Sequence, residues 1–468
     1  MKIIHVSAEC YPIAKVGGLA DVVGALPKYQ NVEGHEASVI MPYYNIPFTQ
    51  NNAFESVYNG VIKMDQVAYD FEILKPENLQ LGFDIYLVKI SGVLYKEYVY
   101  SRDDVERFMA FQTATLSWLS VQSELPQVVH CHDHHTGLVP FMMQYCYDFK
   151  QFKEIPSVLS IHNAQYQGWF SHDKINLIPE FDKEHIGLLD WSGNINPLAC
   201  AIKCAWRVNT VSPSYMEELK ENANHLESLL SHEAPKCIGI LNGIDTEVWN
   251  PEKDSYLVKN YSLQKATSGK KANKKWLCNT FNLDADKPLF AFIGRLVYEK
   301  GSDLFPEAFD QILNNEDVSI LLLGSGEQST EEKLLELKER FKGTFNAFIG
   351  YDEKLSHIIY AGADFLLMPS RVEPCGLNQM YSLRYGTIPV VRSIGGLKDT
   401  IVDMEDGGFG FTHEDATVDQ IVAAVKRACL LYKEQKEFKR IIKHIMQIDH
   451  SWNRSAVAYI NMYESITN

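Results

Sequence analysis

Hydrophobic residues occur along the chain in two alternating patterns, short continuous runs and helical spacing. Short apolar runs such as residues 3–6 (IIHV) have the length and composition of buried β-strands. Downstream of that run, starting at Leu19, apolar residues recur at i, i+3, i+4 and i+7, which is the spacing of one helix face. The N-terminal segment is therefore expected to be a strand, a glycine-containing loop and then a helix.

The same alternation continues through the second half of the chain. Apolar strands followed by amphipathic helices predict parallel sheets covered by helices on both faces. The strands expected in this half are residues 289–294, 318–324, 345–350, 364–370 and 388–392.

A polar, lysine-rich stretch at residues 245–276 separates the two halves. The chain has 468 residues, about twice the size at which single hydrophobic cores stop growing. We therefore expect two α/β domains with a boundary near residue 248, and a final helical run, 451–468, that could pack on either. The lysines at 270, 271, 274 and 275 are expected to form a solvated helix face, with a basic patch as the alternative.

Composition narrows the classes of function. Forty-four basic against sixty acidic residues give a net charge of −16, which disfavours nucleic acid as the main partner. No apolar run is long enough for a membrane span, and no secretory signal is visible at the N-terminus. Nine cysteines without a CxxC pair fit a reducing compartment, so we expect a cytoplasmic protein.

The segments with chemically active residues follow predicted strands. Doubly wound sheets bind ligands beyond the carboxyl ends of their strands. The candidate functional loops are therefore KVGGL (15–19), HCHDHHTG (130–137), HNAQYQG (162–168), GRLVYEKG (294–301) and SRVEPCGL (370–377).

The loop KVGGL has the features of an oxyanion site. Gly17 and Gly18 at a helix N-terminus let the backbone approach a ligand, the unpaired amides and the helix dipole favour an anion, and Lys15 adds a full charge. A plain tight turn would also explain the glycines. The dinucleotide-binding pattern GxGxxG and the Walker pattern are absent, which disfavours an NAD enzyme or a P-loop ATPase.

Two loops of the second half offer cations and a carboxylate. Arg295 and Lys300 lie five residues apart after a buried strand, and Glu373 precedes a helix start with unpaired amides expected at Cys375, Gly376 and Leu377. A surface ion pair and a helix-capping carboxylate are the simpler interpretations. Together, however, the loops could hold a diphosphate and place a carboxylate near its substituent.

These loops, with the segments LNGIDTEVWNP (241–251) and GGLKDT (395–400), closely resemble the bacterial glycogen synthase and plant starch synthase family over nearly the whole chain. The resemblance implies a GT-B fold, in which two Rossmann-like domains, 1–248 and 249–468, face a central cleft. The implied reaction is retaining transfer of glucose from a nucleotide sugar, usually ADP-glucose and alternatively UDP-glucose, to the non-reducing end of an α-1,4-glucan. It implies no cofactor, because the nucleotide sugar is a substrate.

The resemblance also implies roles for individual residues. Lys15, Gly17 and Gly18 match the donor-phosphate loop, and Arg295 with Lys300 the diphosphate-binding pair. The remaining matches are Glu373 beside the donor glucose, His162 and Asn242 around the sugar, Asp133 between donor and acceptor, Tyr351 stacked on the nucleobase, and Glu9 and Tyr95 on the acceptor side.

Some positions depart from the family pattern. The family usually has a lysine and glycines where this chain has Ala199, Cys200 and Ala201, and an acidic residue at the position of Trp206. Tyr381 stands where other GT-B enzymes have a second glutamate, as the glycogen synthase branch permits.

Three other classes remain as alternatives. They are a sibling GT-B enzyme such as a sucrose synthase relative, a non-catalytic glucan-binding protein, and a metalloenzyme whose candidate ligands are His130, His132, Asp133, His134 and His135. Successive residues of a strand face opposite sides, so His130 and His132 should be separated from Asp133. We therefore expect no metal site.

Overall fold

The computed structural model describes residues 1–467, and the chain forms two compact units. Unit 1 comprises residues 1–242 together with the chain from Trp452 onward, and unit 2 is Gly243–Ser451. The boundary expected near residue 248 thus lies inside unit 2, and the final helix belongs to unit 1. Among the described residues, no helix is both long and apolar enough to cross a membrane.

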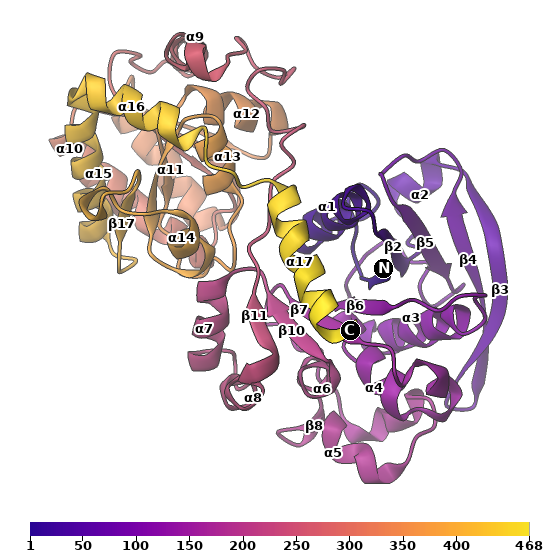
Figure 1. Cartoon of the computed structure of the whole chain (residues 1–468). Helices are drawn as coiled ribbons and strands as arrows, with labels where there is room; N and C mark the ends of the chain where they lie inside the picture. The colour runs from indigo at the N-terminus through magenta and orange to yellow at the C-terminus, as the bar shows by residue number, and fades with distance from the viewer. Residues whose placement is uncertain (468) are drawn as a thin grey trace. The chain divides into compact units, whose positions relative to one another are not determined.

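Unit 1 is built on a nine-stranded sheet in the order β11-β10-β7-β6-β1-β2-β5-β4-β3 (Figure 1). The strands from β11 to β5 are parallel, and β4 and β3 continue the sheet as an antiparallel hairpin. The bounds are β1 (Lys2–Val6), β2 (Glu36–Pro42), β3 (Phe54–Met64), β4 (Val67–Pro76), β5 (Asp84–Lys89), β6 (Val128–His132), β7 (Ser157–Ile161), β10 (Arg207–Thr210) and β11 (Cys237–Gly239).

The hairpin β3–β4 corrects the expectation of a wholly parallel sheet. Much of β3 is exposed to solvent, so it lacks the continuous apolar run that marks a strand covered on both faces. A two-stranded antiparallel pair, β8 (Asp190–Trp191) and β9 (Asn194–Ile195), lies outside the main sheet.

The helices of unit 1 include one from the far end of the sequence. Helix α17 (Trp452–Thr467) packs beside α1 (Gly18–Val32), and its Trp452, Tyr459 and Tyr463 enter the same apolar cluster as Ile3 of β1 (Figure 1). The other α-helices are α2 (Pro47–Asn51), α3 (Asp104–Leu119), α4 (Val139–Tyr145), α5 (Ile186–Leu189), α6 (Pro197–Cys204), α7 (Pro213–Glu221) and α8 (Glu227–His232).

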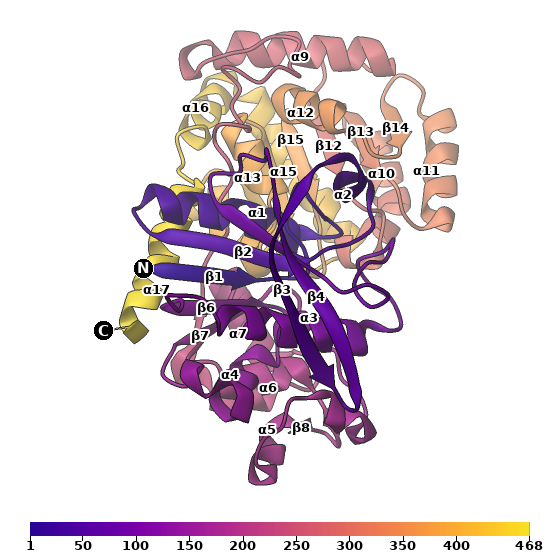
Figure 2. The same cartoon turned by 90° about the vertical axis from the view of Figure 1, so that its right-hand side faces the viewer.

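Unit 2 has a six-stranded, all-parallel sheet in the order β14-β13-β12-β15-β16-β17. Figure 2 shows β14, β13, β12 and β15 side by side. Five of its strands were predicted: β12 (Leu289–Ile293), β13 (Ser319–Gly324), β14 (Phe345–Ile349), β15 (Phe365–Met368) and β16 (Ile388–Arg392), followed by β17 (Phe411–His413). The helices are α9 (Ala266–Phe281), α10 (Phe305–Asn315), α11 (Gln328–Arg340), α12 (Glu353–Gly362), α13 (Asn378–Arg384), α14 (Gly395–Thr400), α15 (Val418–Lys433) and α16 (Gln435–Ile445).

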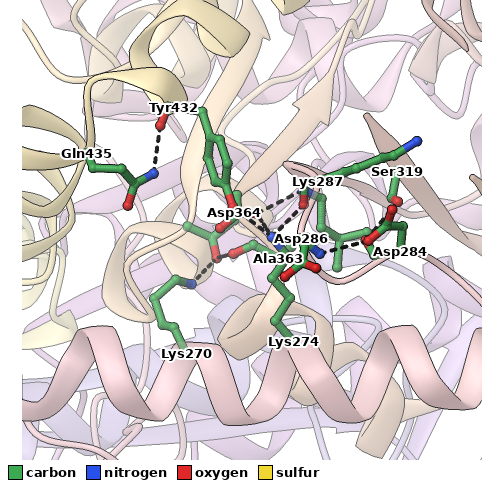
Figure 3. A network of polar contacts seen from close by, with 12 residues as sticks. Lys270, Lys274, Asp284, Asp286, Lys287, Ser319, Ala363, Asp364, Tyr432 and Gln435 are labelled. Carbon is green, nitrogen blue, oxygen red and sulfur yellow. Dashed lines mark hydrogen bonds and ion pairs between the residues drawn. The ribbon is translucent and has the colours of Figure 1, made fainter. Parts of the chain in front are cut away.

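The lysines of α9 correct a second expectation. Lys271 and Lys275 are exposed. Lys270 and Lys274, which lie one turn apart on the same face of the helix, are buried. The Lys274 ammonium lies 2.7 Å from Asp364 Oδ2 and 2.6 Å from the carbonyl oxygen of Lys287 (Figure 3). These contacts join α9 to the residue before β15, so Lys274 forms a buried ion pair and is not part of a solvated face.

Lys270 is buried without a contacting carboxylate. Its ammonium donates to Thr387 Oγ1 at 2.7 Å and to the carbonyl oxygens of Ala361 and Tyr385 at 3.2 and 3.3 Å. Burial lowers the pKa of Lys270 to about 7. The unfolded chain therefore binds more protons than the folded one above pH 7, and this group makes stability rise with pH up to the unfolded lysine pKa.

We expect Lys270→Met to lower the free energy of unfolding by roughly 1 to 3 kcal/mol, because buried oxygens lose their donor. The deficit should grow between pH 7 and pH 10. Lys271→Met is the matched control on the exposed face and should stay within about 0.5 kcal/mol of the wild type. Denaturant unfolding over that pH range measures both, and equal effects of the two substitutions would contradict the structural role of Lys270.

Candidate functional site

Both main sheets reverse their strand order next to their first strand. In unit 1 the reversal lies between β1 and β6, and in unit 2 between β12 and β15. The loops from two such strands leave toward opposite faces of the sheet, which opens a crevice at their carboxyl ends. The loops that follow these four strands contain Lys15, Asp133, Arg295 and Glu373.

Glu9 organises the loop after β1. Its side chain is only 2% exposed, and its Oε2 accepts hydrogen bonds from the backbone amides of Val16 and Gly17 at 2.5 and 3.1 Å. Its other oxygen accepts from the Tyr100 hydroxyl, a partner that the sequence analysis missed because it lies far along the chain. Glu9 thus holds the KVGGL loop, and its predicted contact with an acceptor stays a prediction.

The glycine pair of this loop is not required by packing. A Cβ built on Gly17 or Gly18 would meet no atom within 4 Å, and Gly17 has an extended backbone that any residue can adopt. Lys15 is half-exposed, with its ammonium 2.7 Å from Asp21 Oδ1. The open space at the start of α1 leaves room for a ligand, which favours the oxyanion interpretation over a plain turn.

Asp133 and His162 lie at the ends of the neighbouring strands β6 and β7. Asp133 Oδ1 accepts the backbone amide of His162 at 2.7 Å. Asp133 also has a positive φ of 57°, a conformation that costs a non-glycine residue about 1 to 3 kcal/mol. Burial raises the pKa of its carboxyl to about 7, although the amides of His162 and Asn163 lower it. Strain and a perturbed carboxyl together are typical of a functional position.

The histidines of β6 form a hydrogen-bonded cluster with His5 of β1. His130 and His132 face the same side, as predicted, with ring centroids 4.3 Å apart. With His5 they group nitrogens within 4.8 Å of one another, a spacing that could hold a metal ion. However, the ring nitrogens of all three already have partners, in Gln30, His162, Tyr463, Ser160 and each other. A metal would have to break these bonds.

A pocket in unit 1 was not predicted. Its volume is about 360 Å³, and it lies against α3 and the loop after β7. Tyr166 and Trp169 on its wall are 64% and 66% exposed, and the buried Nδ1 atoms of His134 and His135 on the same wall have no hydrogen-bond partner within residues 1–467. Exposed aromatic rings beside unpaired polar atoms suit a ligand with both apolar faces and hydroxyls.

Asn242 and Tyr95 lie outside this pocket. The Asn242 side chain is buried, and its Oδ1 has no partner among the described residues. Tyr95 is partly exposed and stacks on Tyr43 with centroids 5.5 Å apart. The predicted sugar contact of Asn242 and the predicted acceptor contact of Tyr95 therefore stay predictions.

In unit 2 the structure brings Lys300 and Glu373 together. Lys300 Nζ lies 2.6 Å from Glu373 Oε2, which also accepts from Ser370 Oγ at 2.9 Å. Glu373 is 6% exposed, whereas Arg295 is exposed and has no partner among the described residues. Arg295 and Lys300 could bind an anion here. The ion pair with Lys300 also compensates the charge of the buried Glu373 carboxylate.

The backbone after Glu373 is tightly constrained. A Cβ on Gly395, whose φ is +47°, would lie 2.1 Å from the carbonyl oxygen of Glu373, so the GGLKDT segment can approach this loop only as glycine. Cys375 is buried, and Gly376 has a φ of +70° just before Leu377 and α13. Asn378 at the start of that helix donates to the carbonyl oxygen of Ile293, which ties it to the end of β12.

The structure also shows the exposure and packing of the remaining residues that the sequence singled out. Tyr351 follows β14 and is 82% exposed, so its ring is accessible for stacking. Tyr381, at the position of a second glutamate in other GT-B enzymes, stacks on Trp249 with centroids 3.7 Å apart. Ala199, Cys200 and Ala201, which depart from the expected family pattern, are all buried in α6.

Comparison with known proteins gives a consistent result. Residues 2–232 match the family model described as starch synthase catalytic domain, and residues 278–444 match glycosyl transferases group 1. A glycogen synthase of Flavobacterium johnsoniae is 49% identical over 100% of this chain and 99% of that protein. A glycogen synthase of Thermodesulfovibrio yellowstonii is 36% identical over 100% of this chain and 98% of its own length.

Solved structures show the same architecture. The catalytic domain of starch synthase IV from Arabidopsis thaliana, bound to ADP and acarbose, has a TM-score of 0.89 at 31% identity and covers 100% of this chain and 99% of that one. A sucrose-phosphate synthase of Thermosynechococcus elongatus has a TM-score of 0.64 at 16% identity, covering 99% and 98%, and supports the fold alone. Both comparisons agree with the predicted GT-B fold.

We expect Asp133→Asn to stabilise the protein increasingly as the pH rises from 5 to 8. The folded carboxyl has a raised pKa, so the wild type binds more protons folded than unfolded in this window and loses stability with rising pH. Asparagine does not titrate and tolerates positive φ. The gain at pH 8 should be at least about 1 kcal/mol, since one pKa unit is worth 1.36 kcal/mol.

Asp65→Asn is the matched control for this experiment. Asp65 also has a positive φ, of 53°, but is exposed. Its substitution should leave the pH dependence of unfolding unchanged. If Asp133→Asn and the wild type lose stability in parallel between pH 5 and pH 8, Asp133 does not have the raised pKa.

Proposed function

The chain belongs to the starch and glycogen synthase family of glycosyltransferases, and from this premise we propose that it transfers glucose from ADP-glucose to the non-reducing end of an α-1,4-glucan, with retention of configuration. The observation that carries the proposal is the Lys300–Glu373 pair at the strand reversal of unit 2, on loops that also carry Arg295, an exposed cation without a partner in the described part of the chain. UDP-glucose is the alternative donor.

The donor diphosphate is assigned to the cations of unit 2. When the bond between glucose and diphosphate breaks, negative charge grows on the leaving oxygen. Arg295 and Lys300 stabilise that charge, and Lys300 then shares its ammonium between the phosphate and Glu373. Glu373, desolvated and oriented by Ser370, lies close to the sugar carbon that becomes positive.

Retention, which the family resemblance implies, requires either a covalent intermediate or attack and departure on the same face of the sugar. The loops offer no evident nucleophile opposite the leaving group, so the acceptor hydroxyl attacks on the face from which the diphosphate leaves. The departing phosphate oxygen accepts the proton of that hydroxyl. No metal is needed for charge neutralisation in this proposal, because the cationic side chains and the helix N-terminus at Gly17 supply it.

Unit 1 also has residues that suit parts of the substrates. Lys15 and the open space at Gly17 and Gly18 suit the phosphate groups, and the unused Oδ1 of Asn242 suits a sugar hydroxyl. Tyr166 and Trp169 suit the glucan, since aromatic rings pack on the apolar faces of sugars.

The nucleobase is assigned to Tyr351, whose exposed ring would stack on it. The solved starch synthase IV domain was bound to ADP, which supports adenine in this chain. Stacking alone accepts either base, because every base has a π-face.

The decisive experiment incubates the protein with glycogen and either ADP-glucose or UDP-glucose and measures release of the nucleoside diphosphate. We expect release from ADP-glucose and elongation of α-1,4-linked chains. Arg295→Ala should lower kcat by on the order of 10² to 10³, because it removes one cation from the developing charge. Lys354→Ala, an exposed lysine of α12, is the control and should keep wild-type kcat.

Each outcome of this assay decides part of the proposal. Release from UDP-glucose alone would transfer the donor assignment to UDP. No glucan elongation with either donor would contradict the function, and wild-type kcat in Arg295→Ala would contradict the diphosphate assignment.

We expect Gly17→Ala to reduce activity without reducing stability. The added methyl group meets no protein atom, and the backbone conformation is allowed for alanine. It would, however, occupy the space proposed for the donor phosphates, raising donor KM or lowering kcat about tenfold or more. Gly187→Ala, which also meets no atom, is the control. Unchanged kinetics in Gly17→Ala would remove this loop from the donor site.

A further inference from the structure

Helix α17 starts a chain of buried hydrogen bonds that ends at His162. Gln30 of α1 donates from Nε2 to the Tyr463 hydroxyl at 3.1 Å, and its Oε1 lies 2.8 Å from His5 Nε2. His5 Nδ1 lies 3.0 Å from His132 Nε2, and His132 Nδ1 lies 3.0 Å from His162 Nε2. Four side chains from different elements thus connect the last helix to the predicted sugar site.

The orientation of one amide determines the protons along this chain. An oxygen of Gln30 can only accept, so His5 carries its proton on Nε2 and accepts at Nδ1. His132 must then donate from Nε2 and accept at Nδ1, and His162 must donate from Nε2. The Nδ1 of His162 has no protein partner among the described residues and keeps its lone pair.

The imidazoles of His5, His132 and His162 are neutral. Burial lowers the pKa of His5 to about 4, lowers that of His132 well below its ordinary value, and lowers that of His162 to about 3. Each ring therefore carries one proton at neutral pH, so one of its nitrogens donates a hydrogen bond and the other accepts one.

A second branch of hydrogen bonds fits the same orientation of the Gln30 amide. The Tyr463 hydroxyl, which accepts from Gln30, lies 2.6 Å from His130 Nδ1 and donates to it. His130 Nε2 then donates to Ser160 Oγ at 2.7 Å, and Ser160 donates to Asn209 Oδ1 at 2.7 Å. Turning the amide over would reverse every donor and acceptor in both branches.

We propose that Gln30 and Tyr463 are positioning residues that fix His162 as the Nε2–H tautomer, so that its Nδ1 accepts a hydrogen bond from a hydroxyl of the bound hexose. The proposal rests on the proposed function, a glucosyl transfer in which the family resemblance puts His162 beside the sugar. The other tautomer would present an N–H in place of the acceptor and would turn the sugar hydroxyl the wrong way.

The test replaces Gln30 with methionine, which keeps the length of the side chain and removes its hydrogen bonds. In protein labelled with ¹⁵N at histidine, NMR distinguishes protonated from unprotonated ring nitrogens. We expect the wild type to show a single His162 species with Nδ1 unprotonated, and Gln30→Met to show a mixture of tautomers. Its kcat should fall roughly 10- to 100-fold, as for other second-layer partners of a functional histidine, with KM for glycogen unchanged.

Tyr459→Phe is the matched control. The Tyr459 hydroxyl accepts from Asn209 at 3.1 Å, in the same buried core but at the far end of the branch that does not contain His162. It should cost similar stability and keep the wild-type tautomer and kcat. Tyr463→Phe, which removes the anchor of the amide, should show the mixture and provides the same test if Gln30→Met does not fold.

Two results would overturn the proposal. One is a single wild-type His162 tautomer in both Gln30→Met and Tyr463→Phe. The other is an equal loss of kcat in Gln30→Met and Tyr459→Phe, which would mean that the network acts only through stability. The NMR spectrum is read without substrate, so it stays decisive even if the protein transfers no glucose.

Discussion

The reversal of strand order beside β1 and beside β12 is the constraint on which the candidate site depends. Crossovers between parallel strands are right-handed, so a chain that first adds strands on one side and then on the other must send its helices to opposite faces of the sheet. The loops at the reversal therefore diverge, and the carboxyl ends of the two strands remain uncovered. In each unit the polar residues that matter most follow these two strands, because only there can they reach a ligand without disturbing the apolar layers.

Polar groups at these positions are held by specific partners. Glu9 binds backbone amides, Glu373 binds Lys300 and Ser370, and Asp133 binds the amide of His162. Removing such a group from water is costly, and its partners offset the cost only when the geometry is good. This need explains why the carboxylates predicted for function are buried, while Arg295 and Lys15 remain accessible to bring charge to a ligand.

Helix α17 shows how distant parts of the sequence share one core. Its Trp452, Tyr459 and Tyr463 are part of the apolar cluster beside α1. The hydroxyls of Tyr463 and Tyr459 also accept hydrogen bonds from the buried amides of Gln30 and Asn209. The same helix thus contributes apolar burial and hydrogen-bond order. A buried polar network of this kind tolerates few alternatives, because each unsatisfied group would cost free energy without water to replace its partner.

The sequence by itself determined what local periodicity and motif spacing can encode. Five strands of unit 2, the helix at residues 18–32, the loops after strands and the family resemblance depend on neighbours within a few residues. Tertiary structure decided the rest: the burial of Lys270 and Lys274, the antiparallel hairpin β3–β4, the attachment of Glu9 to Tyr100, the pocket with Trp169, and the path from Tyr463 to His162. Each depends on contacts between residues far apart in the chain. A lysine in a helical pattern looks the same whether its face meets water or Asp364, and only the packed fold distinguishes the two.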